Sequence, residues 1–323
     1  MLRIKSKLKS ILRSTLRSTL RSILRSILNK IRHNTAVYRN NRYAKRIFSK
    51  KRLDNPRRGI LNYYSTFPQD KMPVELSAAV DFLKHNPVTY FPRNLTETCR
   101  AEMVHSDFDH ETGLYFALIN GKRMFFKRGW SESECIHYCY CIQNEQNANS
   151  PHRYLSESFT VQTGDIAIDV GAAEGIFALE VIEKVSKIYL FESDSGWTEA
   201  LKATFAPWRD KVEIVNKYLS DEENPSSTTV DNFFQNRKKP AFIKIDVDGA
   251  EAKVINGCRQ LLSSQEHLKL ALCTYHKQDD ESSFSALLRE KGFDISFSPG
   301  FMLFINDELR PPYFRRGVLQ AMR

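Results

Sequence analysis

The chain has 323 residues, of which 41% are hydrophobic and 27% charged, the balance of a globular protein with a sizeable core rather than of a disordered chain. No apolar run approaches the roughly 18 to 20 residues that a membrane-spanning helix needs, which argues against an integral membrane protein. The formal net charge of +10 is unevenly spread, because residues 1–58 contain 19 Lys or Arg and a single acid, Asp54. An acidic body therefore follows a basic N-terminal arm, which argues against a protein that binds nucleic acid over its whole surface.

The basic arm contains a short repeat with a period of four residues. Its leucines form an apolar stripe beside a stripe of arginines, and both stripes drift slowly around the axis of a helix. The pattern fits an amphipathic helix on an anionic membrane, an Arg-rich transit peptide, or a disordered low-complexity tail. We expect a cytoplasmic protein whose residues 1–58 contact the inner face of the membrane peripherally, with no nucleic-acid partner. The stripes consist of Leu8, Leu12, Leu16, Leu20, Leu24 and Leu28, and of Arg13, Arg17, Arg21 and Arg25.

Residues 59–155 are expected to form a small α+β extension. Apolar spacing predicts a helix over residues 73–86, and the runs Leu114–Ile119 and Arg123–Lys127 around an Asn-Gly pair predict a hairpin. On a strand, Cys135–Cys141 would place three cysteines and a histidine on one face, and these residue types suit zinc. Alternate strand residues lie roughly 6.6 Å apart, too far to share one ion, so we expect buried free thiols instead. No secretory signal precedes the six cysteines, and free thiols are expected for all of them: Cys99, Cys135, Cys139, Cys141, Cys258 and Cys273.

From residue 164 onward, predicted strands and helices alternate. Such alternation indicates an α/β fold with a parallel, doubly wound, Rossmann-like sheet. The segments 293–298 and 301–305 are predicted to close the sheet as a hairpin with an antiparallel last strand. We assign this domain to residues 156–308 and interpret residues 309–323 as a basic C-terminal tail. The other predicted strands are 166–170, 187–192, 212–216, 241–246 and 268–274, and the predicted helices are 176–184, 197–205, 230–234, 251–262 and 284–291.

A glycine-containing turn at the end of the first strand predicts a cofactor site, because ligands of such sheets bind at the carboxyl ends of the strands. Asp169-x-Gly171-x-x-x-Gly175 leads directly into a helix, and Glu192 ends the next strand 17 residues later. A carboxylate at that position can accept both ribose hydroxyls of a nucleoside. The predicted cofactor-binding residues are Asp169, Gly171, Ala172, Ala173, Glu174, Gly175, Glu192 and Ser193.

The charge of this turn separates two classes of nucleoside cofactor. Proteins that bind a nicotinamide dinucleotide usually carry Gly-x-Gly-x-x-Gly, which places the pyrophosphate at the helix N-terminus. Here Asp169 stands near the first glycine position and Glu174 lies inside the loop. Two acids fit poorly against a pyrophosphate but suit a sulfonium and an ammonium, which favours S-adenosylmethionine. A nicotinamide-dependent oxidoreductase and a non-catalytic cofactor-binding module at a membrane remain the alternatives.

At these residues the sequence resembles the FkbM-type methyltransferases, over roughly residues 145–305. The resemblance implies a class I methyltransferase fold and an S-adenosylmethionine-dependent O-methyltransferase, which acts on a hydroxyl of a sugar, a glycan or a related small molecule. Asp248 stands where the family usually has Glu, and Ser193 where it often has Pro. The resemblance rests on the segments 150–154, 164–175, 191–192, 229–233, 242–251 and 274–276.

Methyl transfer to a hydroxyl requires an acceptor for the hydroxyl proton, so we examined the polar residues at the strand ends. Asp246 is predicted as a general base or as the carboxylate that orients the acceptor, although a helix N-cap or an ion-pair partner also fits. Lys244 could pair with Asp246, lower the hydroxyl pKa or form a structural salt bridge. His276 could take the proton or be an ordinary loop histidine. No metal site is predicted, although clustered carboxylates could bind Mg²⁺. The predicted substrate-binding residues are Asp248, Glu251, His152 and Arg153.

Overall fold

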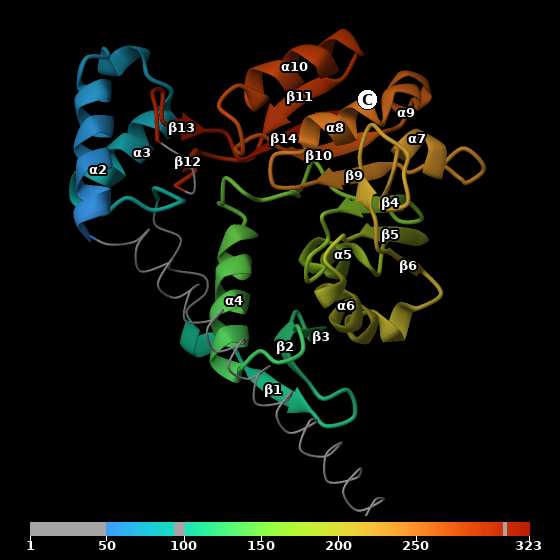
Figure 1. The fold of residues 1–323 in the computed structure, drawn as a ribbon. Helices are drawn as coiled ribbons and strands as arrows, with labels where there is room; N and C mark the ends of the chain where they lie inside the picture. The colour runs from blue at the N-terminus through green and yellow to red at the C-terminus, as the bar shows by residue number, and fades with distance from the viewer. Residues whose placement is uncertain (1–49, 94–100, 306–308) are drawn as a thin grey trace, which may run out of the picture. The chain divides into compact units, whose positions relative to one another are not determined.

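The computed structural model describes residues 50–93, 101–305 and 309–323 (Figure 1). It divides between Arg58 and Gly59 into two compact units, which are described separately. The leucine and arginine stripes predicted for residues 8–28 lie outside the described residues. No helix within the described ranges has both the length and the apolar character required to cross a membrane.

The first part of the described chain contains helices and a three-stranded antiparallel sheet. The predicted helix and the predicted hairpin are both confirmed, as α3 and as the pair β2–β3. The hairpin turns at Asn120 and Gly121, whose φ angles of 49° and 76° match the left-handed turn that an Asn-Gly pair favours. The elements are α2 (Lys50–Ser65), η1 (Gln69–Lys71), α3 (Val74–His85), η2 (Ala101–Met103), β1 (Ser106–Asp109), β2 (Leu114–Ile119), β3 (Lys122–Phe125) and α4 (Glu132–Glu145).

The cysteine-rich segment is helical, so the strand interpretation of Cys135–Cys141 was wrong. Helix α4 begins at a capping box in which Ser131 and Glu134 satisfy each other's backbone N–H groups. Because four residues advance a helix by slightly more than one turn, Cys135 and Cys139 share a buried face while Cys141 points elsewhere and is partly exposed. The five described cysteines are free thiols.

A seven-stranded sheet organises the rest of the chain, in the order β11-β14-β10-β9-β4-β5-β6. Neighbours among β10, β9, β4, β5 and β6 pair in parallel, and β14 runs antiparallel to both of its neighbours. This confirms the predicted doubly wound, mostly parallel sheet, whereas the antiparallel strand is not the predicted segment 301–305. The strands are β4 (Ile166–Val170), β5 (Lys187–Phe191), β6 (Val212–Val215), β9 (Phe242–Ile245), β10 (Lys269–Cys273), β11 (Asp294–Phe297) and β14 (Val318–Met322).

The antiparallel strand comes from the segment that was interpreted as a basic tail. Strand β11 pairs with β14 rather than with residues 301–305, and those residues instead supply β12 (Met302–Leu303), which pairs with β13 (Phe314–Arg315). The physical reason is burial, because Val318, Leu319 and Ala321 of β14 are 0% exposed between β10 and β11. Residues 309–323 are therefore part of the domain and not a tail.

Helices cover both faces of the sheet (Figure 1). Buried residues of α5 and α6 pack on one face together with β2, β3 and α4, and buried residues of α8, α9 and α10 pack on the other. The predicted helix 251–262 is divided at Gly257, where a Cβ atom would lie 2.1 Å from the carbonyl oxygen of Ser220. The remaining elements are α5 (Ile176–Val181), η3 (Ser195–Trp197), α6 (Thr198–Thr204), η4 (Ala206–Trp208), β7 (Tyr218–Leu219), β8 (Ser227–Thr228), α7 (Val230–Phe233), α8 (Glu251–Asn256), α9 (Arg259–Ser264) and α10 (Asp280–Glu290).

Candidate functional site

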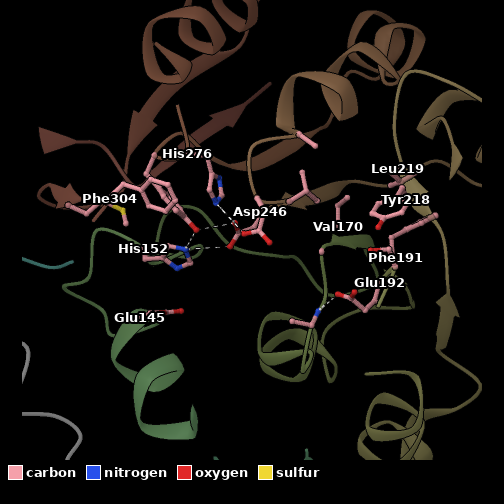
Figure 2. A pocket seen from close by; sticks show the side chains of 18 of the residues that line it. Glu145, His152, Val170, Phe191, Glu192, Tyr218, Leu219, Asp246, His276 and Phe304 are labelled. Carbon is pink, nitrogen blue, oxygen red and sulfur yellow. Dashed lines mark hydrogen bonds and ion pairs between the residues drawn. The ribbon is translucent and has the colours of Figure 1, made fainter. Parts of the chain in front are cut away.

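A cavity of about 760 Å³ lies at the carboxyl ends of β4, β5, β9 and β10, where ligands of doubly wound sheets bind (Figure 2). Figure 2 shows Asp246 in the middle, between two groups of side chains. We name the group that contains Glu192 the nucleoside end, and the group that contains His276 the acceptor end. The labelled residues of the nucleoside end are Val170, Phe191, Glu192, Tyr218 and Leu219, and those of the acceptor end are Glu145, His152, His276 and Phe304.

The two glycines of the turn after β4 are required by close packing. Gly171 has a φ of +75°, and a Cβ atom on it would lie 1.9 Å from the carbonyl oxygen of Asp246. Gly175 has a φ of +85°, and its Cβ would lie 2.8 Å from the ring of Phe205. Both positions therefore exclude side chains because other parts of the protein occupy the space, and the turn is held directly against the end of β9.

Glu192 lies on the wall of the nucleoside end, and its carboxylate is fixed by the backbone. Its Oε2 accepts a hydrogen bond of 2.8 Å from the N–H of Ala173, and its Oε1 accepts one of 2.7 Å from the N–H of Asp194. Apolar parts of Phe191, Tyr218 and Leu219 complete the wall. Each carboxylate oxygen can accept more than one hydrogen bond, so Glu192 retains the capacity to bind a neighbouring diol.

Two other acids of the turn lie beneath the cavity wall rather than on it. Asp169 is 1% exposed, and its Oδ1 lies 3.0 Å from the Nζ of Lys244, which also donates a 2.6 Å hydrogen bond to the carbonyl of Gly171. Burial raises the pKa of Asp169, although the ammonium of Lys244 opposes this. Lys244 is thus placed as a structural salt-bridge partner of Asp169 that supports the turn, and the predicted pairing with Asp246 is not a direct contact in this structure.

Glu174, the second acid of the loop, is also buried. Its Oε2 accepts a 2.7 Å hydrogen bond from the hydroxyl of Tyr138, a residue of α4 that lines the cavity. Burial raises the pKa of Glu174 to about 7, against the lowering effect of that hydrogen bond. The pair connects α4 to the loop behind the nucleoside end.

Asp246 lies at the centre of the acceptor end, and four side chains are directed toward its carboxylate. The hydroxyls of Tyr154 and Tyr275 donate hydrogen bonds of 2.7 and 3.2 Å, and the Nε2 atoms of His152 and His276 lie 3.4 and 3.8 Å away. Burial alone would raise the pKa of Asp246, but the hydrogen bond from His152 and the nearby positive charges outweigh it and lower that pKa well below its ordinary range. The carboxylate is therefore anionic at neutral pH.

His276 follows β10 and is surrounded by carboxylates. Its Nδ1 lies 2.9 Å from Glu251, and its Nε2 lies 3.6 Å from Asp248. Burial lowers the pKa of His276, but the nearby carboxylates of Asp248, Glu251 and Asp246 outweigh it and raise that pKa to about 10. His276 is consequently an imidazolium at neutral pH.

A comparison with protein families identifies the domain that forms this cavity. Residues 135–295 match the family described as the methyltransferase FkbM domain. The chain carries an FkbM methyltransferase domain. The fold of this FkbM domain continues beyond the matched residues, because β14 lies at Val318–Met322.

Solved structures similar to this chain were also found. An FkbM methyltransferase from Methylobacillus flagellatus KT shares 17% identity over 58% of this chain and 54% of that chain, with a TM-score of 0.42. The chain thus spans about half the length of that protein. The precorrin-6y C5,15-methyltransferase from Geobacter metallireducens GS-15 shares 11% identity over 56% of this chain and 86% of that chain, with a TM-score of 0.37. Among curated proteins, no sequence matches the chain.

The predicted site residues fall into two groups in the FkbM domain. Arg153 does not line the cavity, because its guanidinium pairs with Glu180 of α5. Glu251 is 1% exposed and faces His276 rather than the cavity, so the structure does not support the predicted contact of either residue with substrate. Ala172 and Gly175 lie behind the wall, together with the buried acids and Lys244 described above. The predicted residues that line the cavity are Gly171, Ala173, Glu192, Ser193, His152, Asp246, Asp248 and His276.

No metal site is assigned in the part of the chain that the structure describes. Two groups contain the residue types of metal ligands, and both include Asp246. Their ring nitrogens and carboxylate oxygens already contact one another in the histidine–carboxylate pairs of the acceptor end.

Several residues of the site were not predicted from the sequence. The most important are Tyr154 and Tyr275, whose hydroxyls donate to Asp246, and Glu145, whose pKa is raised by burial. Tyr275 and Glu145 line the cavity, whereas Tyr154 contacts Asp246 without lining it. Both tyrosines stand beside predicted residues, at the end of the His152–Tyr154 segment and directly before His276, and this adjacency was the available signal. The other unpredicted lining residues are Tyr90, Phe91, Tyr138, Val170, Phe191, Lys217, Tyr218, Leu219, Val247, Ala250, Met302 and Phe304.

Arg315 of β13 holds the loop that carries Tyr275 and His276. Arg315 is 5% exposed, and its guanidinium donates hydrogen bonds of 2.6 and 2.9 Å to the backbone carbonyls of these two residues. We expect Arg315→Ala to lower the free energy of unfolding by about 2 to 4 kcal/mol, since buried carbonyls lose charged donors. Arg315→Lys should recover only part of the lost stability, because an ammonium group cannot reproduce the planar arrangement of N–H donors in a guanidinium. Urea denaturation measures both, and Arg209→Ala, at a side chain that is 86% exposed, is the control.

Proposed function

We propose that the chain is an S-adenosylmethionine-dependent O-methyltransferase whose acceptor is a hydroxyl of a sugar, a glycan or a related small molecule. The observation that carries the proposal is the single cavity in which Asp246 lies between Glu192 and a histidine-rich acceptor end (Figure 2). A methyl donor and its acceptor must meet in one water-poor space, and this cavity offers a nucleoside-binding wall and a proton-accepting wall on the two sides of one carboxylate.

The lining residues fit the proposed cofactor. The fixed carboxylate of Glu192 suits the two ribose hydroxyls, and the side chains of Phe191 and Leu219 suit the faces and edges of an adenine. Asp246 remains anionic and favours a cationic group beside it. A pyrophosphate would instead meet Glu192, Asp246 and the other acids, with Lys217 the one lysine or arginine among the described lining residues. When bound, S-adenosylmethionine supplies an electrophilic methyl group.

The residues of the acceptor end divide the remaining tasks. Asp246 is poorly suited as a general base, because its pKa is lowered and Tyr154 and Tyr275 already occupy its oxygens. It fixes the tyrosines and the histidines in place, while the neutral form of His276, which becomes more abundant as pH rises, presents Nε2 as the proton acceptor. Aromatic side chains such as Phe91 and Phe304 exclude water and offer flat apolar surfaces to the C–H faces of a sugar ring. Binding in this geometry would align the acceptor oxygen with the methyl group.

Glu192→Gln tests the nucleoside end. We expect it to weaken binding of S-adenosylhomocysteine by about 10- to 100-fold, the effect of losing charged hydrogen bonds to the ribose. The amide oxygen can still accept one backbone hydrogen bond, so the melting temperature without ligand should change little. Isothermal titration calorimetry measures the affinity, and Glu180→Gln, outside the cavity, is the matched control. Tight binding of NAD(H) by the unmodified chain, with no binding of S-adenosylhomocysteine, would contradict the proposed function and favour an oxidoreductase.

A further inference from the structure

We propose that Glu251 is a positioning residue, which holds His276 by its Nδ1 atom and leaves Nε2 as the atom that receives the acceptor proton. This inference rests on the proposed function and adds a residue to it. Glu251 does not line the cavity, so it acts through the imidazole and not on the substrate.

The carboxylate of Glu251 contacts the ring of His276 in addition to the backbone N–H groups that a helix-capping residue binds. It is 1% exposed at the start of α8, and its Oε1 lies 2.9 Å from Nδ1 of His276. The same oxygen accepts hydrogen bonds of 3.0 and 3.3 Å from the N–H groups of Val247 and Gly249. A carboxylate held by two backbone donors cannot swing away, and it favours the state of the imidazole in which Nδ1 carries a proton.

The other ring nitrogen faces the cavity. Nε2 of His276 lies 3.6 Å from Asp248 and 3.8 Å from Asp246, and both distances are longer than a direct hydrogen bond. The ring is directed toward Asp246 at the centre of the cavity (Figure 2). The backbone of His276 is fixed from behind by the hydrogen bond from Arg315. Nε2 is therefore free to meet an acceptor hydroxyl, whereas Nδ1 is not.

The chemical step balances with this assignment. As the acceptor oxygen forms its bond to the methyl carbon, its O–H bond breaks and the proton passes to Nε2 of a neutral His276. The electron pair of the broken bond between methyl carbon and sulfur stays on sulfur. The imidazolium then returns its proton to water. Glu251 stabilises the positive charge that the ring acquires, in the way that a buried carboxylate supports a catalytic histidine.

The charges around His276 make the step depend on pH. Three carboxylates face the ring, from Asp246, Asp248 and Glu251, while the guanidinium of Arg315 contacts its backbone carbonyl. His152, Lys244 and His276 all lie near the carboxylate of Asp246 and lower its pKa. The carboxylates prevail, and the pKa of His276 is raised to about 10. The neutral, proton-accepting form thus becomes more abundant as pH rises from 7, and the rate of methyl transfer is expected to rise with it.

Glu251→Gln tests the inference in the full-length chain. The amide oxygen can still accept from Nδ1, but the negative charge is lost, so we expect the pKa of His276 to fall by about 1 to 3 pH units. NMR titration of the imidazole C–H signals, with His276→Gln for assignment, measures this without any ligand. The rising limb of the pH–rate profile should move to lower pH by a similar amount, with a reduced plateau. Glu251→Asp, which keeps the negative charge, should return the rising limb of the pH–rate profile toward its original pH but should restore the plateau rate less completely.

Two further variants keep the test decisive. Asp248→Asn removes an exposed carboxylate next to Nε2 and should also lower the pKa of His276, which shows that the titration responds to a single lost charge. If Glu251→Gln does not fold, Glu251→Asp, which keeps the charge but shortens the side chain, answers the question by its reduced plateau. Glu180→Gln should change neither the titration nor the profile. A folded Glu251→Gln chain with unchanged His276 titration would overturn the inference and leave Glu251 as a helix cap. If the unmodified chain failed to bind S-adenosylhomocysteine while the titrations still shifted, the proposed function would fail and the pairing of Glu251 with His276 would stand.

Discussion

A chain that ends at Glu308 is expected to be insoluble or unfolded, because residues 309–323 supply β13 and β14. Strand β14 lies between β10 and β11, and its removal would expose two long strand edges. The buried side chains of Val318 and Leu319 contribute roughly 1.5 to 3 kcal/mol each, and the strand also carries two ladders of backbone hydrogen bonds. This loss is comparable with the total stability of a domain, about 5 to 15 kcal/mol.

Two point variants separate this expectation from a general effect of shortening the chain. Leu319→Asp places a charge at a position that is 0% exposed, whereas Met322→Asp places it at a position in the same strand that is 40% exposed. We expect the first to abolish cooperative urea unfolding and the second to change the unfolding midpoint only slightly. A soluble truncated chain with a native circular dichroism spectrum and an unchanged melting temperature would show that β14 is dispensable.

The sequence predicts the parallel part of the fold because each strand there is a short apolar run followed by a turn signal. The run 166–170 is buried along its whole length, so its pattern reports its environment directly. Strand β14 carries the same kind of signal, but Arg315, Arg316 and Arg323 make the segment resemble a charged tail. These arginines are used inside the domain: Arg315 braces a loop and Arg323 donates to the backbone carbonyls of Lys291 and Gln265.

The site could be predicted where chemistry is tied to a strand end, and not where it depends on contacts between distant segments. Glu192 and Asp246 follow β5 and β9 directly, so the fold alone brings them to one edge of the sheet. Tyr154 and Asp246 are separated by 92 residues of sequence, and no local sequence pattern predicts the hydrogen bond between them. Likewise, the sequence placed Glu251 near the site but could not show that its carboxylate turns toward His276 and away from the cavity.

Replacing Asp246 is expected to have the largest effect of any single change in the cavity. Asp246→Ala leaves the hydroxyls of Tyr154 and Tyr275 and the ring of His152 without their shared acceptor, in a region where each of the three is at most 8% exposed. We expect a loss of roughly 3 to 5 kcal/mol in the free energy of unfolding, the usual result of removing one partner from a buried charged network. Asp246→Asn should lose less, because one amide oxygen can still accept from a tyrosine.

Activity and pH dependence distinguish the role of the charge from the role of the shape. In the Asn variant we expect methyl transfer to fall by about 10²- to 10⁴-fold, the range for losing a group that organises proton transfer. Because the pKa of Asp246 is lowered in the folded protein, its contribution to stability is complete above its ordinary value of 3.8 and is lost as pH falls below that value. The stability difference between the original chain and the Asn variant should therefore be constant from pH 5 to 7 and shrink toward pH 2, as measured by urea unfolding. Asp210→Asn, at a side chain that is 98% exposed, is the control. An Asn variant that retained full activity and the original pH dependence would mean that Asp246 contributes shape alone and that its charge takes no part in methyl transfer.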